Sequence, residues 1–178
     1  MRTLILTAAL LFPMAAFAAG SSSDSTPPKP TETTKSCENG QIWDKSTKTC
    51  VDAKESRLDD DTRYSAVREL AYAGKYEDAL YVLAAMSDQS ESRVLTYYGF
   101  THRKAGRTEL GMQYYQAALK ADPDNLLARS YMGQGLVAAG NIEAARVQLA
   151  EIKARGGRSS WPELSLRKAL QTGKTYNY

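Results

Sequence analysis

The sequence predicts an all-α protein, a helix–turn–helix solenoid of three repeats with a C-terminal capping helix, preceded by a small disulfide-closed loop. Segments that begin with Ala-Gly recur along the chain, and their glycines lie at positions 74, 106 and 140, spaced by 32 and 34 residues. Apolar residues between these glycines recur at helical spacing. Repetition with such a period is typical of stacked helix pairs that bury a continuous core between neighbours.

Composition narrows the class of protein. The chain has 178 residues, 43% of them hydrophobic, with 23 basic and 20 acidic side chains and a formal net charge of +3. This excludes wholesale disorder, and the small excess of charge gives no reason to expect a nucleic acid or an anionic membrane as partner. One histidine and two cysteines offer little material for a metal site or a nucleophile–base pair. We therefore expect no enzyme activity, no metal and no cofactor.

The first 18 residues have the pattern of a secretory signal peptide. Arg2 gives a positive start, residues 4–17 are apolar, and small residues precede the predicted cleavage between Ala18 and Ala19. The apolar run is shorter than the ~20 residues that span a bilayer as a helix. We expect export to the periplasm without a membrane span after cleavage, with secretion beyond the periplasm as the alternative.

Residues 19–36 are predicted to be a disordered linker. From Gly20 onward the segment contains Ser, Thr, Pro and charged residues without a large apolar side chain. Nothing in it offsets the entropy lost on ordering.

Cys37 and Cys50 bracket a predicted mini-module, residues 37–51. Two cysteines 13 positions apart in an exported chain most simply form one structural disulfide. The Asn39-Gly40 pair is a strong turn signal, and the flanking residues predict a short hairpin. Trp43 has two interpretations: it packs over the disulfide, or its exposed face stacks on a sugar ring.

This loop resembles one fragment of a peritrophin-type, chitin-binding cysteine module. The matching positions are Cys37, Gly40, Trp43, Asp44, Thr49, Cys50 and Val51. The resemblance implies a possible glycan contact at Trp43.

The helical repeats are predicted over residues 60–91, 92–125 and 126–159, and a capping helix over about 161–172, within a domain of residues 58–173. In the middle repeat, Gly106 can adopt the left-handed conformation that ends a helix, and Thr108 can cap the next helix. Asp122-Pro123 closes the unit, because the residue before a proline is disfavoured in helical geometry.

These repeats resemble the tetratricopeptide repeat family. The middle repeat carries large, small and proline residues at the expected positions: Leu95, Tyr98, Gly99, His102, Gly111, Tyr115, Ala118 and Pro123. The resemblance implies a non-catalytic interaction module in which the first helix of each pair lines a concave groove. The groove positions that it implies are Tyr64, Arg68, Tyr72, Arg93, Thr96, Phe100, Arg103, Lys104, Leu127, Ser130, Gln134 and Val137.

We therefore expect an exported adaptor that holds a segment of another envelope protein. The basic and aromatic groove residues suit an acidic or carboxylate-bearing segment with an apolar anchor, through charge-assisted hydrogen bonds and cation–π contacts. The alternative for these charges is that they only keep the face soluble. The alternative function is binding of cell-wall glycan or another carbohydrate through Trp43.

Overall fold

The computed structural model describes residues 28–175. Within this range the chain forms eight helices and one two-stranded antiparallel sheet. The predicted signal peptide, its cleavage site at Ala18-Ala19 and the linker up to residue 27 lie outside the described residues. No helix between residues 28 and 175 has the length and apolar character needed to cross a membrane.

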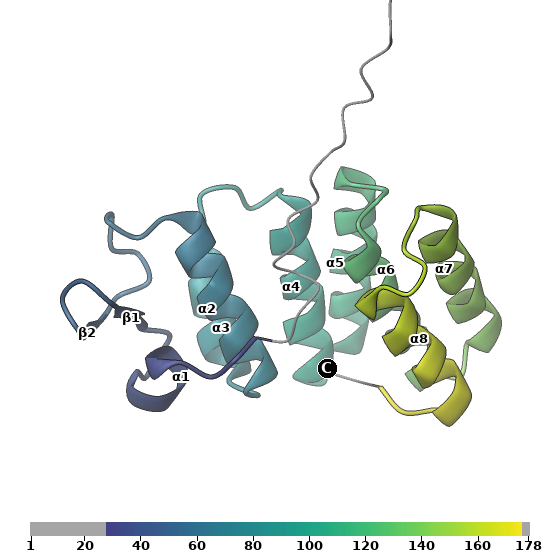
Figure 1. Ribbon diagram of the computed structural model, residues 1–178, viewed down its shortest axis with the longest axis horizontal. Helices are drawn as coiled ribbons and strands as arrows, with labels where there is room; N and C mark the ends of the chain where they lie inside the picture. The colour runs from purple at the N-terminus through teal and green to yellow at the C-terminus, as the bar shows by residue number, and fades with distance from the viewer. Residues whose placement is uncertain (1–27, 176–178) are drawn as a thin grey trace, which may run out of the picture.

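The predicted solenoid is confirmed. Three antiparallel helix pairs follow one another along the molecule, and a single helix closes the row (Figure 1). The helices are α2 (Asp60–Tyr72) with α3 (Tyr76–Ala84), α4 (Ser92–Lys104) with α5 (Thr108–Ala121), α6 (Leu126–Ala138) with α7 (Ile142–Ala154), and α8 (Trp161–Thr172).

The repeated glycines end the first helix of each pair. Gly74, Gly106 and Gly140 have φ of 78°, 86° and 78°, in the left-handed region where a side chain is disfavoured. One predicted cap is wrong: Thr108 is the first residue of α5 and does not cap it, because the preceding Arg107 occupies the N-cap position. The N-cap of α6 is Asn125, whose side chain accepts a hydrogen bond from the Ala128 amide.

Helices α4 and α5 cross closely because glycines face each other. A Cβ atom on Gly99 would lie 2.5 Å from a ring carbon of Tyr115 and 3.0 Å from the carbonyl oxygen of Gly111. Tyr115 is fully buried, so its ring has no free space into which to move. The two glycines therefore set the distance between the helices of the middle repeat.

Helix α8 continues the stack as the first helix of a further, unpaired unit. Leu166 of α8 is fully buried and packs against Gly133 of α6. A Cβ atom on Gly133 would lie 2.6 Å from the Leu166 side chain. Ala145 and Ile152 of α7 belong to the same buried cluster as Leu166. The predicted capping helix thus covers both helices of the third repeat.

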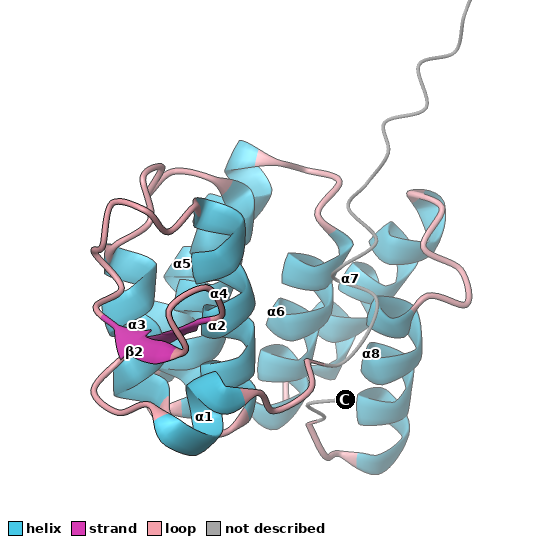
Figure 2. Cartoon of the chain, turned by 60° about the vertical axis from the view of Figure 1, so that its left-hand side comes forward, coloured by secondary structure: helices cyan, strands magenta, loops and turns pink. Residues whose placement is uncertain are grey.

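The cysteine module covers the opposite end. Strand β1 (Ile42–Asp44) pairs with β2 (Thr49–Val51), with Ile42 opposite Val51, and the disulfide between Cys37 and Cys50 is present. Ile42 and Val51 belong to the buried cluster that includes the first repeat. The module lies against α2 and α3 and is therefore the N-terminal cap of the solenoid (Figure 2).

The prediction that residues 19–36 form a disordered linker is wrong at its C-terminal end. Residues Glu32–Ser36 form the short helix α1. The carboxylate of Glu69 accepts hydrogen bonds from the amides of Thr31 and Thr34, at 2.7 and 3.0 Å, and the ammonium of Lys75 donates to the Thr34 carbonyl at 2.9 Å. This segment has no large apolar side chain of its own, and polar contacts with α2 and with the start of α3 order it.

Candidate functional site

The residues predicted to line a groove lie on α2, α4 and α6, and we call the side of these helices that carries them the inner-helix face. The aromatic residues among them come together across repeats. The rings of Tyr72 and Phe100 stack with centroids 5.3 Å apart, and Phe100 lies 4.8 Å from the ring of Tyr131. Tyr64 packs edge-on against Tyr97, at 5.4 Å. A continuous row of rings therefore joins the three repeats.

Two members of this row, Tyr97 and Tyr131, were missed by the sequence analysis. Both are fully buried, and they are 34 residues apart, the same spacing as the second and third glycines. Their recurrence at the repeat period was the signal that could have identified them.

The cations of the inner-helix face differ in their partners. Arg93 forms ion pairs with Asp61 and Glu91, at 2.6 and 2.5 Å, and its guanidinium lies 4.9 Å from the centre of the Tyr64 ring. Arg68 donates a hydrogen bond to the Tyr97 hydroxyl at 3.3 Å. The charge of Arg93 is thus already matched by local carboxylates.

Arg103 and Lys104 form a cationic pair at the end of α4. Arg103 donates to the Tyr115 hydroxyl at 3.4 Å, and its guanidinium lies 6.0 Å from the centre of the Phe100 ring. Burial lowers the pKa of Lys104, and the positive charge of Arg103 lowers it further. Both effects indicate a lysine in a site that disfavours its own charge.

Three predicted groove residues have structural roles. Thr96 donates to the Ser92 carbonyl at 2.7 Å and accepts from the Asn125 side chain at 3.0 Å, which joins α4 to the start of α6. Ser130 and Gln134 are fully buried. Their side chains lie 2.9 and 3.4 Å from the Ser165 hydroxyl of α8.

These contacts remove Thr96, Ser130 and Gln134 from the candidate surface, because their polar groups fasten neighbouring helices. Three of the remaining predicted residues are partly exposed: Tyr72, Arg93 and Lys104. The others are buried: Tyr64, Arg68, Phe100 and Arg103. Leu127 and Val137, the other two positions that the resemblance implied, are also buried.

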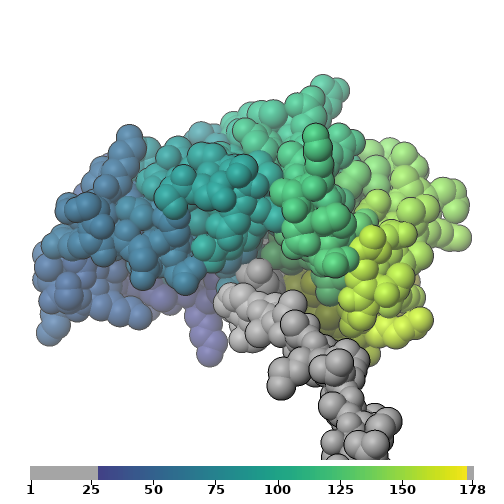
Figure 3. All heavy atoms as spheres, turned by 90° about the horizontal axis from the view of Figure 1, so that it is seen from above, coloured from purple at the N-terminus to yellow at the C-terminus, as the bar shows by residue number. Residues whose placement is uncertain are grey.

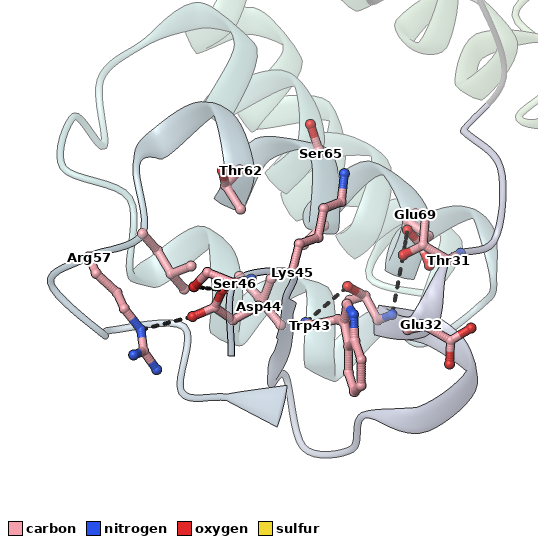
Figure 4. Close-up of a pocket in the computed structure, with 14 residues that line it drawn as sticks. Thr31, Glu32, Trp43, Asp44, Lys45, Ser46, Arg57, Thr62, Ser65 and Glu69 are labelled. Carbon is pink, nitrogen blue, oxygen red and sulfur yellow. Dashed lines mark hydrogen bonds and ion pairs between the residues drawn. The ribbon is translucent and has the colours of Figure 1, made fainter. Parts of the chain in front are cut away.

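Trp43 lies at a second candidate site, a pocket of about 620 Å³ between the cysteine module and α2 (Figure 4). The buried side chains of Ile42 and Leu58 contribute apolar lining, and hydroxyls of Thr62 and Ser65 come from α2. Trp43 itself is partly exposed. The sequence could not reveal this pocket, because its two sides come from segments that the fold alone brings together.

The carboxylate of Asp44 is held ionised in this pocket. The Ser46 hydroxyl and amide donate hydrogen bonds to it at 2.6 and 2.8 Å and lower its pKa to about 2. Arg57 also forms an ion pair with it at 3.1 Å. The pocket therefore offers an aromatic ring, a fixed carboxylate and several hydroxyl groups.

His102 lies in an aromatic stack rather than in a catalytic arrangement. Its ring is nearly parallel to that of Tyr114, with centroids 5.4 Å apart, and its Nδ1 accepts a hydrogen bond from Arg107 at 2.8 Å. Burial lowers the pKa of His102 below the ordinary value of 6.5, and the charge of Arg107 lowers it further, although Glu77 opposes this.

We expect the protein to lose stability through His102 as the pH falls below 6.5. The unfolded chain then binds a proton that the folded state binds only at lower pH, so protonation favours unfolding. The melting temperature should fall between about pH 7.5 and about pH 5 by more in the wild type than in His102→Gln. Equal falls in the two proteins would contradict this role of His102.

The fold and these contacts define a class of protein, a helical-repeat solenoid. Within this class, residues 102–162 match the tetratricopeptide repeat family. The matched segment runs from the end of α4 to the start of α8, and the helix pair that precedes it has the same architecture. No curated protein and no solved structure matches the chain. Tetratricopeptide repeats are generally non-catalytic modules for protein–protein interaction.

Proposed function

We propose that this protein is an exported, non-catalytic adaptor whose inner-helix face binds an acidic segment of another envelope protein. The observation that carries the proposal is the cationic pair Arg103 and Lys104 at the end of the aromatic row formed by Tyr72 and Phe100. The match of residues 102–162 to the tetratricopeptide repeat family supports a protein partner in general.

The two parts of this face favour two features in the partner. Tyr72 is partly exposed and stacked, so it offers a rigid surface to an apolar side chain. The cationic pair favours a carboxylate, because hydrogen bonds between charged groups are roughly twice as strong as neutral ones. An acidic segment with one apolar anchor satisfies both.

The disulfide supports the proposal of export. Such bonds persist in the periplasm and outside the cell and are rare in the reducing cytosol. It agrees with the signal-peptide pattern of residues 1–18, and periplasmic localisation follows from the two together as a proposal.

Selection from a displayed random peptide library tests the partner class. Residues 19–178 should enrich peptides that contain Asp or Glu near an apolar residue. Lys104→Glu should weaken binding of these peptides about tenfold or more, because it replaces attraction by repulsion. Lys120→Glu, an equal change of charge at an exposed position of α5, should leave binding unchanged. Enrichment of basic peptides, or equal binding by the two variants, would contradict the proposal.

A carbohydrate is the second candidate ligand, and the pocket beside Trp43 is the observation that favours it. An aromatic ring beside a fixed carboxylate and hydroxyl groups can stack on a sugar and hydrogen-bond its hydroxyls. If this function holds, Trp43→Ala should abolish retention on cell-wall sacculi or chitin oligosaccharides, while Lys104→Glu should retain it. Retention by Trp43→Ala equal to that of the wild type would exclude the pocket as a glycan site.

A further inference from the structure

A pocket of about 510 Å³ lies where the ends of three repeats meet, and we call it the Arg103 pocket. Arg103 and Lys104 enter it from the end of α4, and Tyr76 and Thr108 from the starts of α3 and α5. The end of α6 and Thr175, which follows α8, form the remaining sides. Its polar lining is thus made of two cations and hydroxyl groups.

Two glycines determine the path of the Arg103 side chain. A Cβ on Gly111 would lie 2.8 Å from the Cβ of Arg103, and a Cβ on Gly135 would lie 3.0 Å from its Cδ. A side chain at Gly111 would press on the start of the Arg103 side chain, and one at Gly135 would press on its middle. The arginine is therefore held in place by α5 and α6 and is only 9% exposed.

The guanidinium of Arg103 is incompletely satisfied. Its Nε donates to the Tyr115 hydroxyl, but its Nη2 is buried without a hydrogen-bond partner among residues 28–175. A buried charged donor without an acceptor is unfavourable, and folded proteins usually satisfy such groups. Because Arg103 lines the pocket, an acceptor bound there would lie beside this guanidinium and reduce the cost of its burial.

The charge balance of the pocket points in the same direction. Arg103 and Lys104 lie side by side in the pocket, and none of the described residues that line it is Asp or Glu. The mutual repulsion of the two cations contributes to the lowered pKa of Lys104. A bound anion would offset both the repulsion and the burial of charge.

We propose that the Arg103 pocket binds one carboxylate, supplied by an Asp or Glu side chain of the partner segment. Arg103 and Lys104 provide the charge, and the hydroxyls of Tyr76 and Thr108 donate additional hydrogen bonds. The inference rests on the proposed function, since the carboxylate belongs to the segment that the inner-helix face holds. The inference also places the acidic residue of the bound partner segment at the end of α4.

Titration of isotopically labelled protein, residues 19–178, with sodium glutarate tests the pocket without any partner. Glutarate carries the carboxylate and short chain of a glutamate side chain, and ionic strength is held constant with sodium chloride. We expect saturable amide shifts at Lys104, Thr108 and Ala139, and affinity about tenfold weaker in Lys104→Met. Lys120→Met is the matched control and should bind as the wild type does. Shifts that are unsaturable, or equal in the two variants, would overturn the proposal.

The peptide selection separates this inference from the proposed function. Repeated on Lys104→Glu, it should replace the acidic residue of the selected motif by Lys or Arg and leave the apolar residue unchanged. An unchanged acidic motif would overturn the pocket, and weaker binding of those peptides by the same variant would leave groove binding standing. Saturable glutarate binding without any selected peptide would support the pocket and contradict the proposed function.

Discussion

Gly99→Leu should lower the free energy of unfolding by about 3 kcal/mol or more, the upper end of the usual cost of overpacking a core. The new side chain would begin 2.5 Å from the Tyr115 ring, which is fully buried and packs beside Tyr131. On the other side it would meet the Gly111 carbonyl at 3.0 Å. Helices α4 and α5 would have to separate, and with them the middle of the stack.

Urea unfolding followed by circular dichroism measures this effect. Ala150→Leu, which introduces the same side chain at an exposed position of α7, is the control and should change stability by less than about 0.5 kcal/mol. Equal stability of Gly99→Leu and wild type would show that the close crossing of α4 and α5 is not required.

Glu69→Ala should detach the beginning of the N-terminal cap and lower the free energy of unfolding by about 3 kcal/mol. Glu69 is 7% exposed, and its carboxylate accepts hydrogen bonds from the amides and hydroxyls of Thr31 and Thr34. Its removal leaves those donors without their acceptor and removes negative charge from the N-terminus of α1, where such charge is favourable.

Hydrogen exchange resolves where this stability is lost. In Glu69→Ala, the amides of Thr31 to Ser36 should exchange much faster, whereas those of α6 and α7 should change little. Glu77→Ala is the control, because Glu77 is exposed and forms only a surface ion pair with Arg107. Undiminished protection of α1 in Glu69→Ala would mean that the cap is held by its apolar contacts alone.

Much of the solenoid was predictable because its signals are local. The glycines that end helices act through their own backbone conformation, and the disulfide joins two cysteines 13 residues apart. Ser160 caps the start of α8, and Gly173 ends this helix in the left-handed conformation. Both signals come from residues at the ends of the helix itself.

Features that depend on distant partners were not predictable. Helix α1 is ordered by Glu69 and Lys75, which lie 35 to 41 residues away from the Thr34 groups that they bind. The predicted groove residues Ser130 and Gln134 are covered because α8 places Ser165 against them. Neither contact has a local sequence pattern, and both change which residues are open to a partner.

Site-directed photocrosslinking tests the central claim most directly, that the inner-helix face holds the partner. The full chain would carry benzoylphenylalanine in place of Tyr72 on this face or of Gln116, an exposed residue of α5, in the cell that produces it. We expect Tyr72 to crosslink to an acidic segment of one protein, Lys104→Glu to remove this crosslink, and Gln116 to give none to the same segment. Crosslinks to that segment from Gln116 alone, or from Tyr72 irrespective of Lys104, would contradict this claim.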